Sequence, residues 1–357
     1  MDALGKQNPP RRDDAVEAAP HFDRLAGHEA HKRVLTAAAL SGRVAHAYLF
    51  SGPEGVGKRL CALAFARLLN CTAPEDEEQG RACPSCRKIE RNTHPDVFVL
   101  EPEGSKEIKV GQIREQVEER LQRTPVEGRY KVAVVDDAHR MNAAAQNAFL
   151  KTLEEPPPRT VMVLVTEEPG ALLPTVRSRC QHLVFSPLPL DEVSRELEAR
   201  GVLAGQEALE AAAIAGGSLG RALRMDGEAL ALAREAAARL GGTEWRGSAA
   251  RLLDYAASLP VGGGVEDVER LGLVFDVLHL VLHEALRLRL GMSTALPMGS
   301  PLHEAAAAAA EGHGTEALVE MARMVEEARE RTLAAGSNKL LILENLWLRL
   351  ARVGGEE

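Results

Sequence analysis

The chain has 357 residues, of which 45% are hydrophobic and 3% aromatic, and its formal net charge is −9. At roughly 150 residues per domain, this length predicts two or three domains, with cores built mainly from Leu, Val and Ala. The negative charge argues against the chain being, by itself, the main nucleic-acid binder of an assembly. No apolar run reaches membrane-spanning length. Five cysteines without an apolar leader predict a protein of the reducing cytoplasm.

The first half of the chain alternates between strand-like and helix-like segments. Residues 1–20 are predicted to form a disordered tail. Continuous apolar runs indicate strands buried on both faces, and helical spacing separates them. This alternation predicts a parallel α/β domain over residues 21–187. We expect strands at 47–50, 97–101, 131–136, 160–166 and 183–185, and helices at about 28–41, 60–69, 110–123, 142–154 and 172–180.

After Pro189 no further strand is predicted. Short helices should form a small domain over 188–242, with Asp191 as the N-cap of the first. A glycine-rich break at 241–247 separates this small domain from a larger helical domain over 243–357. We expect the short helices at about 191–199, 206–215, 220–225 and 228–240, and long ones at about 266–290, 315–335 and 339–352.

A phosphate-binding loop follows the first expected strand. Residues 52–58 (GPEGVGK) fit G-x-x-x-x-G-K, and a strand before and a helix after supply the context that this motif needs. The glycines let backbone N–H groups turn toward an anion, and the lysine reaches the outer phosphates. Arg59 stands where a Ser or Thr hydroxyl normally holds Mg²⁺. The loop is therefore predicted to cradle phosphate but to be poorly equipped for metal-assisted transfer. Its candidate nucleotide-binding residues are Gly52, Pro53, Gly55, Val56, Gly57, Lys58 and Arg59.

An acidic pair ends the expected central strand at 131–136. Asp136 is in the position of a carboxylate that orients Mg²⁺. Asp137 occupies the place of a glutamate base and is one methylene shorter. A shift of about 1 Å in a general base can cost about a hundredfold in rate. Alternatively, Asp136 is only a strand-ending turn residue, but the glycine loop upstream favours a nucleotide site.

Several segments together resemble a known family. Residues 46–53 (HAYLFSGP), 93–96 (THPD), 147–157 (NAFLKTLEEPP) and 177–180 (RSRC), in this order, resemble the bacterial clamp-loader branch of the AAA+ ATPases. Residues 337–345 resemble the last collar helix of that family. The resemblance implies an AAA+ domain followed by a helical lid and a helical collar.

The resemblance also implies a role in DNA replication. The chain would join gamma/tau motor subunits and a delta subunit in a hetero-oligomer, and would reach a sliding clamp and primed DNA through that complex. The assembly would serve a DNA-directed DNA polymerase. ATP or ADP would be bound without hydrolysis, and Mg²⁺ binding is doubtful, because the loop is broken at Arg59. The alternative is an active gamma/tau-like ATPase. A P-loop kinase or transferase lacks any acceptor-site signal.

Three further positions take their roles from the resemblance. Arg179 would be an arginine finger, presented to the γ-phosphate of ATP on a neighbouring subunit; the alternative is a surface arginine that caps a helix. Thr166 would be a polar sensor of that phosphate, or simply a strand-ending threonine. In the second-sensor helix at about 216–223, Gly220 stands where the motor subunit has arginine. Arg221 is one residue, or about 100° of helix, away.

The cysteines form a partial zinc pattern. The family carries C-x8-C-x2-C-x2-C after the loop helix, and here the four positions are Cys71, Gly80, Cys83 and Cys86. Structural zinc takes four closed ligands. Three thiolates would hold zinc with a water or with His94, although the resemblance also gives that histidine a structural role. The alternative is three free thiols.

The remaining motifs have simpler interpretations. Cys61 and Cys180 are predicted to be small core residues. Leucines spaced along the last helix would pack in a collar between subunits or in an ordinary intramolecular core. These are Leu340, Leu341, Leu343, Leu346 and Leu350.

Overall fold

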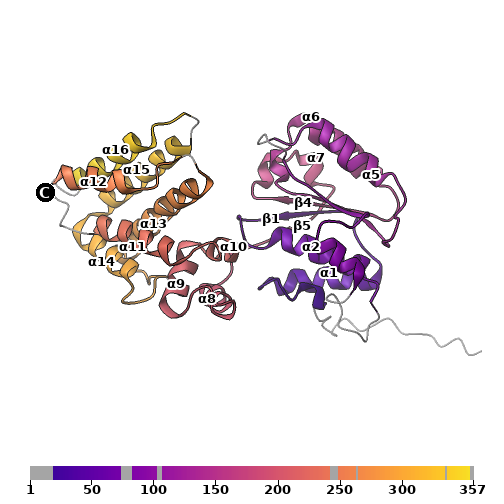
Figure 1. The fold of residues 1–357 in the computed structure, drawn as a ribbon, viewed down its shortest axis with the longest axis horizontal. Coiled ribbons are helices and arrows are strands. Elements are labelled where there is room, and N and C mark those ends of the chain that lie inside the picture. Colours follow the sequence, from indigo (N-terminus) through magenta and orange to yellow (C-terminus); the bar gives the residue numbers. More distant parts are fainter. Residues whose placement is uncertain are drawn as a thin grey trace, which may run out of the picture. The chain divides into compact units, whose positions relative to one another are not determined.

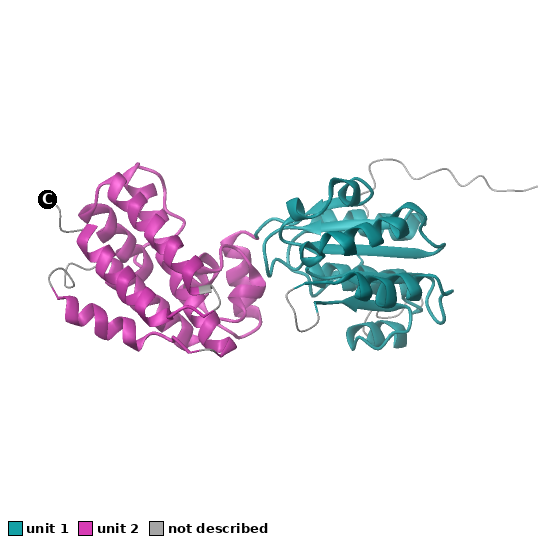
Figure 2. Ribbon diagram, turned by 90° about the horizontal axis from the view of Figure 1, so that it is seen from above, with its two compact units in different colours: residues 1–187 teal, residues 188–357 magenta. Residues whose placement is uncertain are grey.

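The computed structural model describes residues 19–73, 83–102, 107–241, 248–262, 264–333 and 336–353. The chain divides into two compact units, residues 1–187 and 188–357 (Figure 2). The expected disordered tail lies almost entirely outside the described residues. So do Gly80 and most of the glycine-rich break.

The first unit contains a five-stranded parallel sheet with the order β2-β3-β4-β1-β5. This confirms the predicted parallel α/β fold. Strands β1, β3 and β4 are buried throughout, as their continuous apolar runs predict. Strand β5 is a largely exposed edge strand, displaced from the predicted 183–185. The strands are β1 (Ala47–Ser51), β2 (Val97–Leu100), β3 (Lys131–Val135), β4 (Thr160–Thr166) and β5 (Gln181–Val184).

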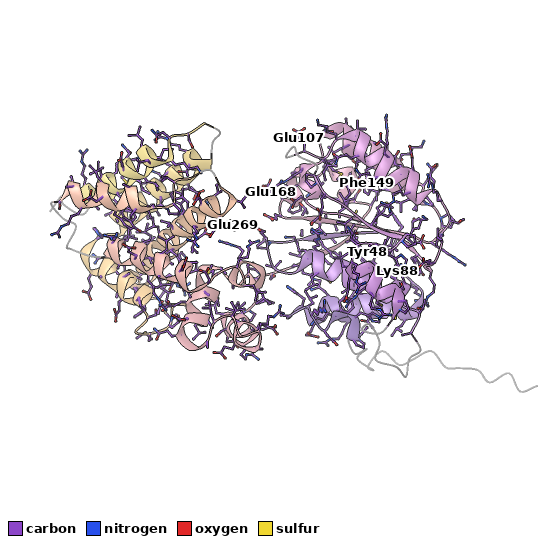
Figure 3. The ribbon with its side chains drawn as sticks, in the orientation of Figure 1. Tyr48, Lys88, Glu107, Phe149, Glu168 and Glu269 are labelled. Carbon is purple, nitrogen blue, oxygen red and sulfur yellow. The ribbon has the colours of Figure 1, made fainter. Side chains whose placement is uncertain are left out.

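Helices cover both faces of this sheet (Figure 1). Successive side chains of a strand point to opposite faces, so Tyr48 packs beneath the first helical layer while Leu49 packs beneath the second. Tyr48 and Phe149, which lie in these two cores, are on opposite sides of the sheet (Figure 3). The first layer holds η1 (Pro20–Phe22), α1 (Glu29–Ser41), α2 (Lys58–Asn70) and α3 (Pro84–Glu90); the second holds α4 (Val110–Gln112), the π-helical η2 (Ile113–Glu118), α5 (Glu119–Leu121), α6 (Ala143–Glu154) and α7 (Pro174–Arg177).

Two short 3₁₀ turns, η3 (Ala138–Arg140) and η4 (Pro169–Ala171), follow β3 and β4. The expected helix at 172–180 is reduced to the single turn of α7. Helix α3 was not predicted, because its seven residues are too few to show a clear helical period.

The described residues of the second unit form helices joined by loops and no strand, as predicted. Its first helix begins at Leu190 after Pro189, so Asp191 lies in the first turn and the predicted N-cap is wrong. Helix α11 packs against α13 and α14; the division into lid and collar at 242/243 stays a prediction. The helices are α8 (Leu190–Ala199), α9 (Gly205–Ile214), α10 (Leu219–Ala222), α11 (Gly227–Gly241), α12 (Ala249–Ser258), α13 (Val265–Arg289), α14 (Pro301–Gly312), α15 (Thr315–Leu333) and α16 (Lys339–Val353).

The leucines of α16 divide between two environments. Leu343, Leu346 and Leu350 are buried in the core of the second unit, whereas Leu341 is 60% exposed. An intramolecular core therefore accounts for part of the set. Within the described parts of the chain, no helix is both long enough and apolar enough to cross a bilayer.

A buried carboxylate fixes the loop before β3. Asp96 is fully buried and accepts hydrogen bonds from the backbone N–H groups of Val126, Glu127 and Gly128 at 2.7–3.0 Å. Lys131 Nζ lies 3.6 Å from its Oδ1. Burial alone would raise the pKa of Asp96, but these N–H groups and Lys131 hold it below its usual value.

We expect Asp96→Ala to lower the free energy of unfolding by about 3–5 kcal/mol, because it leaves the buried Lys131 charge and three backbone N–H groups without their partner. The measurement is urea denaturation followed by circular dichroism. The control, Asp191→Ala, removes an exposed ion pair and should cost less than about 1 kcal/mol. Equal losses in the two variants would contradict the role of Asp96.

Candidate nucleotide site and cysteine cluster

The glycine loop joins β1 to α2 in a conformation that requires its glycines. Gly52 has φ +145°, and a Cβ there would lie 2.1 Å from the carbonyl oxygen of Phe185. Gly57 has φ +99°, and a Cβ there would lie 2.6 Å from Leu25 Cδ1. Gly55 also has a positive φ, of 73°. The loop therefore has the backbone expected of a phosphate cradle at the N-terminus of a helix.

Lys58 folds back over this loop. Its side chain is buried, and Nζ donates hydrogen bonds of 2.6 Å to the carbonyl oxygens of Gly52 and Pro53. Burial lowers the pKa of Lys58, and the nearby carboxylates of Glu167 and Asp136 oppose that shift. The ammonium group is thus held at the mouth of the loop.

Arg59 binds the acidic edge of the sheet. Its Nη1 lies 3.1 Å from Asp136 Oδ2, and its Nη2 lies 2.5 Å from Glu101 Oε1. Burial raises the pKa of Asp136, and the Arg59 charge opposes that shift. A guanidinium therefore neutralises the carboxylate that would otherwise orient Mg²⁺.

Sequence reasoning missed Glu101. The signal was present, because this acid directly follows β2, and the carboxyl ends of parallel strands meet at one edge of the sheet.

Asp137 is not arranged as a free base. It adopts a left-handed backbone conformation with φ 48° and caps η3. Its carboxylate lies 3.4 Å from Arg140 Nε in an ion pair on the partly exposed surface. Its N–H donates to Asp136 Oδ1 at 3.2 Å.

Thr166 lies beside the glycine loop. Its carbonyl oxygen accepts a hydrogen bond of 3.2 Å from the N–H of Gly52. Its buried hydroxyl accepts from the N–H of Glu168 at 3.1 Å and lies 3.4 Å from His139 Nδ1. The hydroxyl is thus used to shape the end of β4, and the sensor role stays a prediction.

Two arginines proposed from the resemblance make ion pairs within their own units. Arg179 follows α7 on the surface of the first unit, where Nη2 donates to Glu154 Oε1 at 2.7 Å and Nη1 to the Thr175 carbonyl at 3.0 Å. Arg221 pairs with Asp276 on α13 in the second unit. Arg221, one residue from the second-sensor position, is therefore committed to internal packing.

The structure brings three cysteines together beside α2. Cys71 follows the last residue of α2, Cys83 caps α3, and Cys86 lies in the first turn of α3; all three are buried in one cluster. Burial, followed by the neighbouring thiols, raises the pKa of Cys86. Cys61 is buried in the first core, and Cys180 packs against the second.

His94 has the structural role that the family motif implies. Its Nε2 lies 3.1 Å from Ser85 Oγ, and its Nδ1 accepts a hydrogen bond of 3.0 Å from the N–H of Asp96. Because both ring nitrogens are engaged, the alternative of His94 as a zinc ligand does not fit this arrangement.

The fold and site define a parallel α/β protein with a phosphate-binding type of glycine loop, in which Arg59 stands where a metal-binding hydroxyl is usual. Residues 27–189 match the family described as DNA polymerase III, delta subunit. The resemblance to the bacterial clamp-loader branch is thereby confirmed.

Curated relatives agree with this family. The chain is 43% identical over 194 residues to the DNA polymerase III subunit delta′ of Pseudomonas aeruginosa, covering 53% of this chain and 58% of that protein. It is 41% identical over 146 residues to the delta′ subunit of Bacillus subtilis, covering 41% and 44%. It is 39% identical over 168 residues to the gamma/tau subunit of Mycobacterium tuberculosis strain H37Rv, covering 47% and 29%. The chain thus spans less than two thirds of the length of these relatives.

Among solved structures, a gamma subunit-related DNA polymerase III protein of Thermotoga maritima is similar with a TM-score of 0.48 and 19% identity. The match covers 90% of this chain and 99% of that one.

We expect Arg59→Thr to release Asp136 and to supply the missing hydroxyl. Mg²⁺ should then strengthen the binding of a fluorescent ATP analogue by about tenfold, or ~1.4 kcal/mol, in an equilibrium titration of the purified chain. The wild-type chain should show little dependence on Mg²⁺. Arg59→Ala removes the guanidinium without adding a ligand, so it should gain less. An equal response of all three proteins would contradict this role of Arg59.

Proposed function

We propose that this chain is a delta′-like subunit of a DNA polymerase III clamp loader. It would assist the loading of a sliding clamp onto primed DNA, with weak or no ATP hydrolysis of its own. The support is the match of residues 27–189 to the delta-subunit family and the similarity to two delta′ subunits. Polymerase activity would belong to other chains of the assembly.

The observation that carries this proposal is the contact of Arg59 with Asp136. Metal-assisted phosphoryl transfer needs Mg²⁺ bridging the β- and γ-phosphates, held by a loop hydroxyl and a strand-end carboxylate. In this chain the hydroxyl is absent and a cation already lies 3.1 Å from the carboxylate. The loop conformation and Lys58 still favour phosphate, so we expect ATP or ADP to be held without turnover.

Arg179 would act on the nucleotide of a neighbouring motor subunit. Arginine is always charged and planar, which suits stabilisation of the charge that develops on a transferring phosphoryl group. Its side chain is 36% exposed and is held by Glu154 at 2.7 Å. That single carboxylate contact lies on the surface, so exchange for a phosphate on another subunit would cost little.

An active gamma/tau-like ATPase remains the competing function, because the chain is also similar to gamma/tau subunits. Lys58 and Asp136 are common to both functions, whereas Arg59 and Asp137 favour the subunit that does not hydrolyse ATP. ATP turnover by the purified chain alone separates the two: brisk hydrolysis would contradict the proposal.

The partners follow from the same proposal. Gamma/tau motor subunits and a delta subunit would bind directly, while the sliding clamp and primed DNA would be reached through the hetero-oligomer. The net charge of −9 agrees with DNA contacts made mainly by other subunits. Such an assembly would work in the cytoplasm.

We expect Arg179→Ala to lower ATP hydrolysis stimulated by clamp and primed DNA in the reconstituted complex. An arginine finger contributes a factor of about 10³–10⁵ to the rate of hydrolysis in well-studied nucleotidases. The one motor site that this chain would serve should therefore hydrolyse almost no ATP in the variant. The measurement is steady-state phosphate release, with assembly checked by size-exclusion chromatography.

The matched control is Arg177→Ala, which removes an exposed arginine from α7 and should leave the rate nearly unchanged. If Arg179→Ala hydrolyses ATP as fast as the wild-type complex, or if both variants lose activity equally, the finger role is wrong.

A further inference from the structure

A buried histidine faces the cysteine cluster. His21 is 2% exposed, and one of its ring nitrogens lies with the Cys71 and Cys86 sulfurs in a group whose atoms are all within 4.8 Å of one another. Within the described parts of the chain, neither ring nitrogen of His21 has a hydrogen-bond partner. A buried imidazole without partners is destabilising, so this arrangement needs a compensating ligand.

The position of His21 is fixed by its backbone. Arg67 on α2 donates one hydrogen bond to the His21 carbonyl oxygen and another to Glu90 on α3. The neighbouring Phe22 is buried in the first core, against the sheet and α2. Arg67 therefore links η1 to α2, which ends just before Cys71, and to α3, which carries Cys86.

Cys83 lies beside this group, in the same buried cluster of cysteines. Its thiol contacts that of Cys86, and its sulfur accepts a hydrogen bond of 3.4 Å from the N–H of Thr72. Backbone N–H donation to sulfur is the kind of contact that orients metal-binding cysteines. Cys83 and Cys86 also have the C-x2-C spacing of a zinc knuckle.

We propose that His21 replaces the ligand missing at Gly80, so that this chain holds Zn²⁺ through one imidazole nitrogen and the sulfurs of Cys71, Cys83 and Cys86. Three thiolates and an imidazole form a recognised structural zinc set. Zn–S and Zn–N bonds of about 2.3 and 2.0 Å place tetrahedral ligand atoms about 3.5–3.8 Å apart. The ligand atoms of His21, Cys71 and Cys86, all within 4.8 Å of one another, need only a small contraction to reach that geometry. Cys83 would join them through a movement of its thiol, which contacts that of Cys86. The cysteines bind as thiolates and release their protons to solvent.

In this site a histidine distant in sequence would replace the cysteine that is missing at Gly80. The metal would tie η1, the end of α2 and the start of α3 together, using a histidine from a segment 50 residues before Cys71 in the sequence. The inference concerns metal binding by the chain alone and is independent of whether the chain assists a motor subunit.

The test uses the full chain, expressed with added zinc and purified without chelator. The wild-type protein should carry near-stoichiometric zinc by mass spectrometry. Its cobalt-substituted form should absorb as a tetrahedral centre with thiolate charge transfer. His21→Ala should lower the affinity for zinc by more than the roughly 10–100-fold that is typical of losing a group that only orients a ligand. The affinity is measured by competition with a chelating dye.

Two variants keep the result decisive. His21→Cys restores a ligand, so it should retain zinc and show stronger thiolate-to-cobalt absorption; this variant decides the outcome if His21→Ala does not fold. His94→Gln changes a buried histidine of the same region and should retain zinc like the wild type. Wild-type protein without zinc, wild-type affinity in His21→Ala, no added thiolate absorption in His21→Cys, or an equal loss in His94→Gln would each overturn the proposal.

Discussion

The ion pair between Arg59 and Asp136 determines what the carboxyl edge of the sheet can do. In a P-loop enzyme this edge gathers Mg²⁺ and the transferring phosphate between a loop hydroxyl and a strand-end acid. Here the guanidinium spans Asp136 and Glu101, the acids that follow β3 and β2. A divalent ion entering this edge would have to displace a cation already bound to its ligand. The glycine loop keeps the positive φ values expected of a phosphate cradle, while Asp136 is paired with Arg59.

Helix α2 connects this edge to the cysteine cluster. It begins at Lys58, beneath the loop, and ends at Asn70, just before Cys71. Arg67 near its end also binds the segment that carries His21. Because a helix is stiff over this length, the cluster can act as a fixed end for the element that presents the loop. A structural metal there would stabilise the support of the nucleotide site without taking part in its chemistry.

The second unit follows the same pattern of internal neutralisation. Arg221 lies one residue from the family position of a second sensor and pairs with Asp276, which also lies 3.1 Å from Arg329. Burial raises the pKa of Asp276, and the two arginines oppose that shift. A side chain held in such a network gives up more than a free surface arginine would on turning toward a nucleotide. Arg59 and Arg221 are thus both held by carboxylates of their own units.

The sequence by itself determined the strands, most helices and the glycine loop. Strands buried on both faces read as unbroken apolar runs, and the loop glycines have a fixed spacing because the backbone at Gly52 and Gly57 has no room for a side chain. The edge strand β5 was predicted at displaced residues, because its largely exposed side chains leave no continuous apolar run. Helix α3 was missed, because its seven residues are too few to show a clear helical period.

Only the tertiary structure decided which distant groups meet. Arg59 reaches Glu101 across 42 residues, and His21 comes within 4.8 Å of two cysteine sulfurs further along the chain. A local pattern reports which face of an element is buried. It does not report which segment covers that face, because this depends on how the helices pack on the sheet. The identity of the arginine's partners and of the histidine's neighbours therefore came from the fold alone.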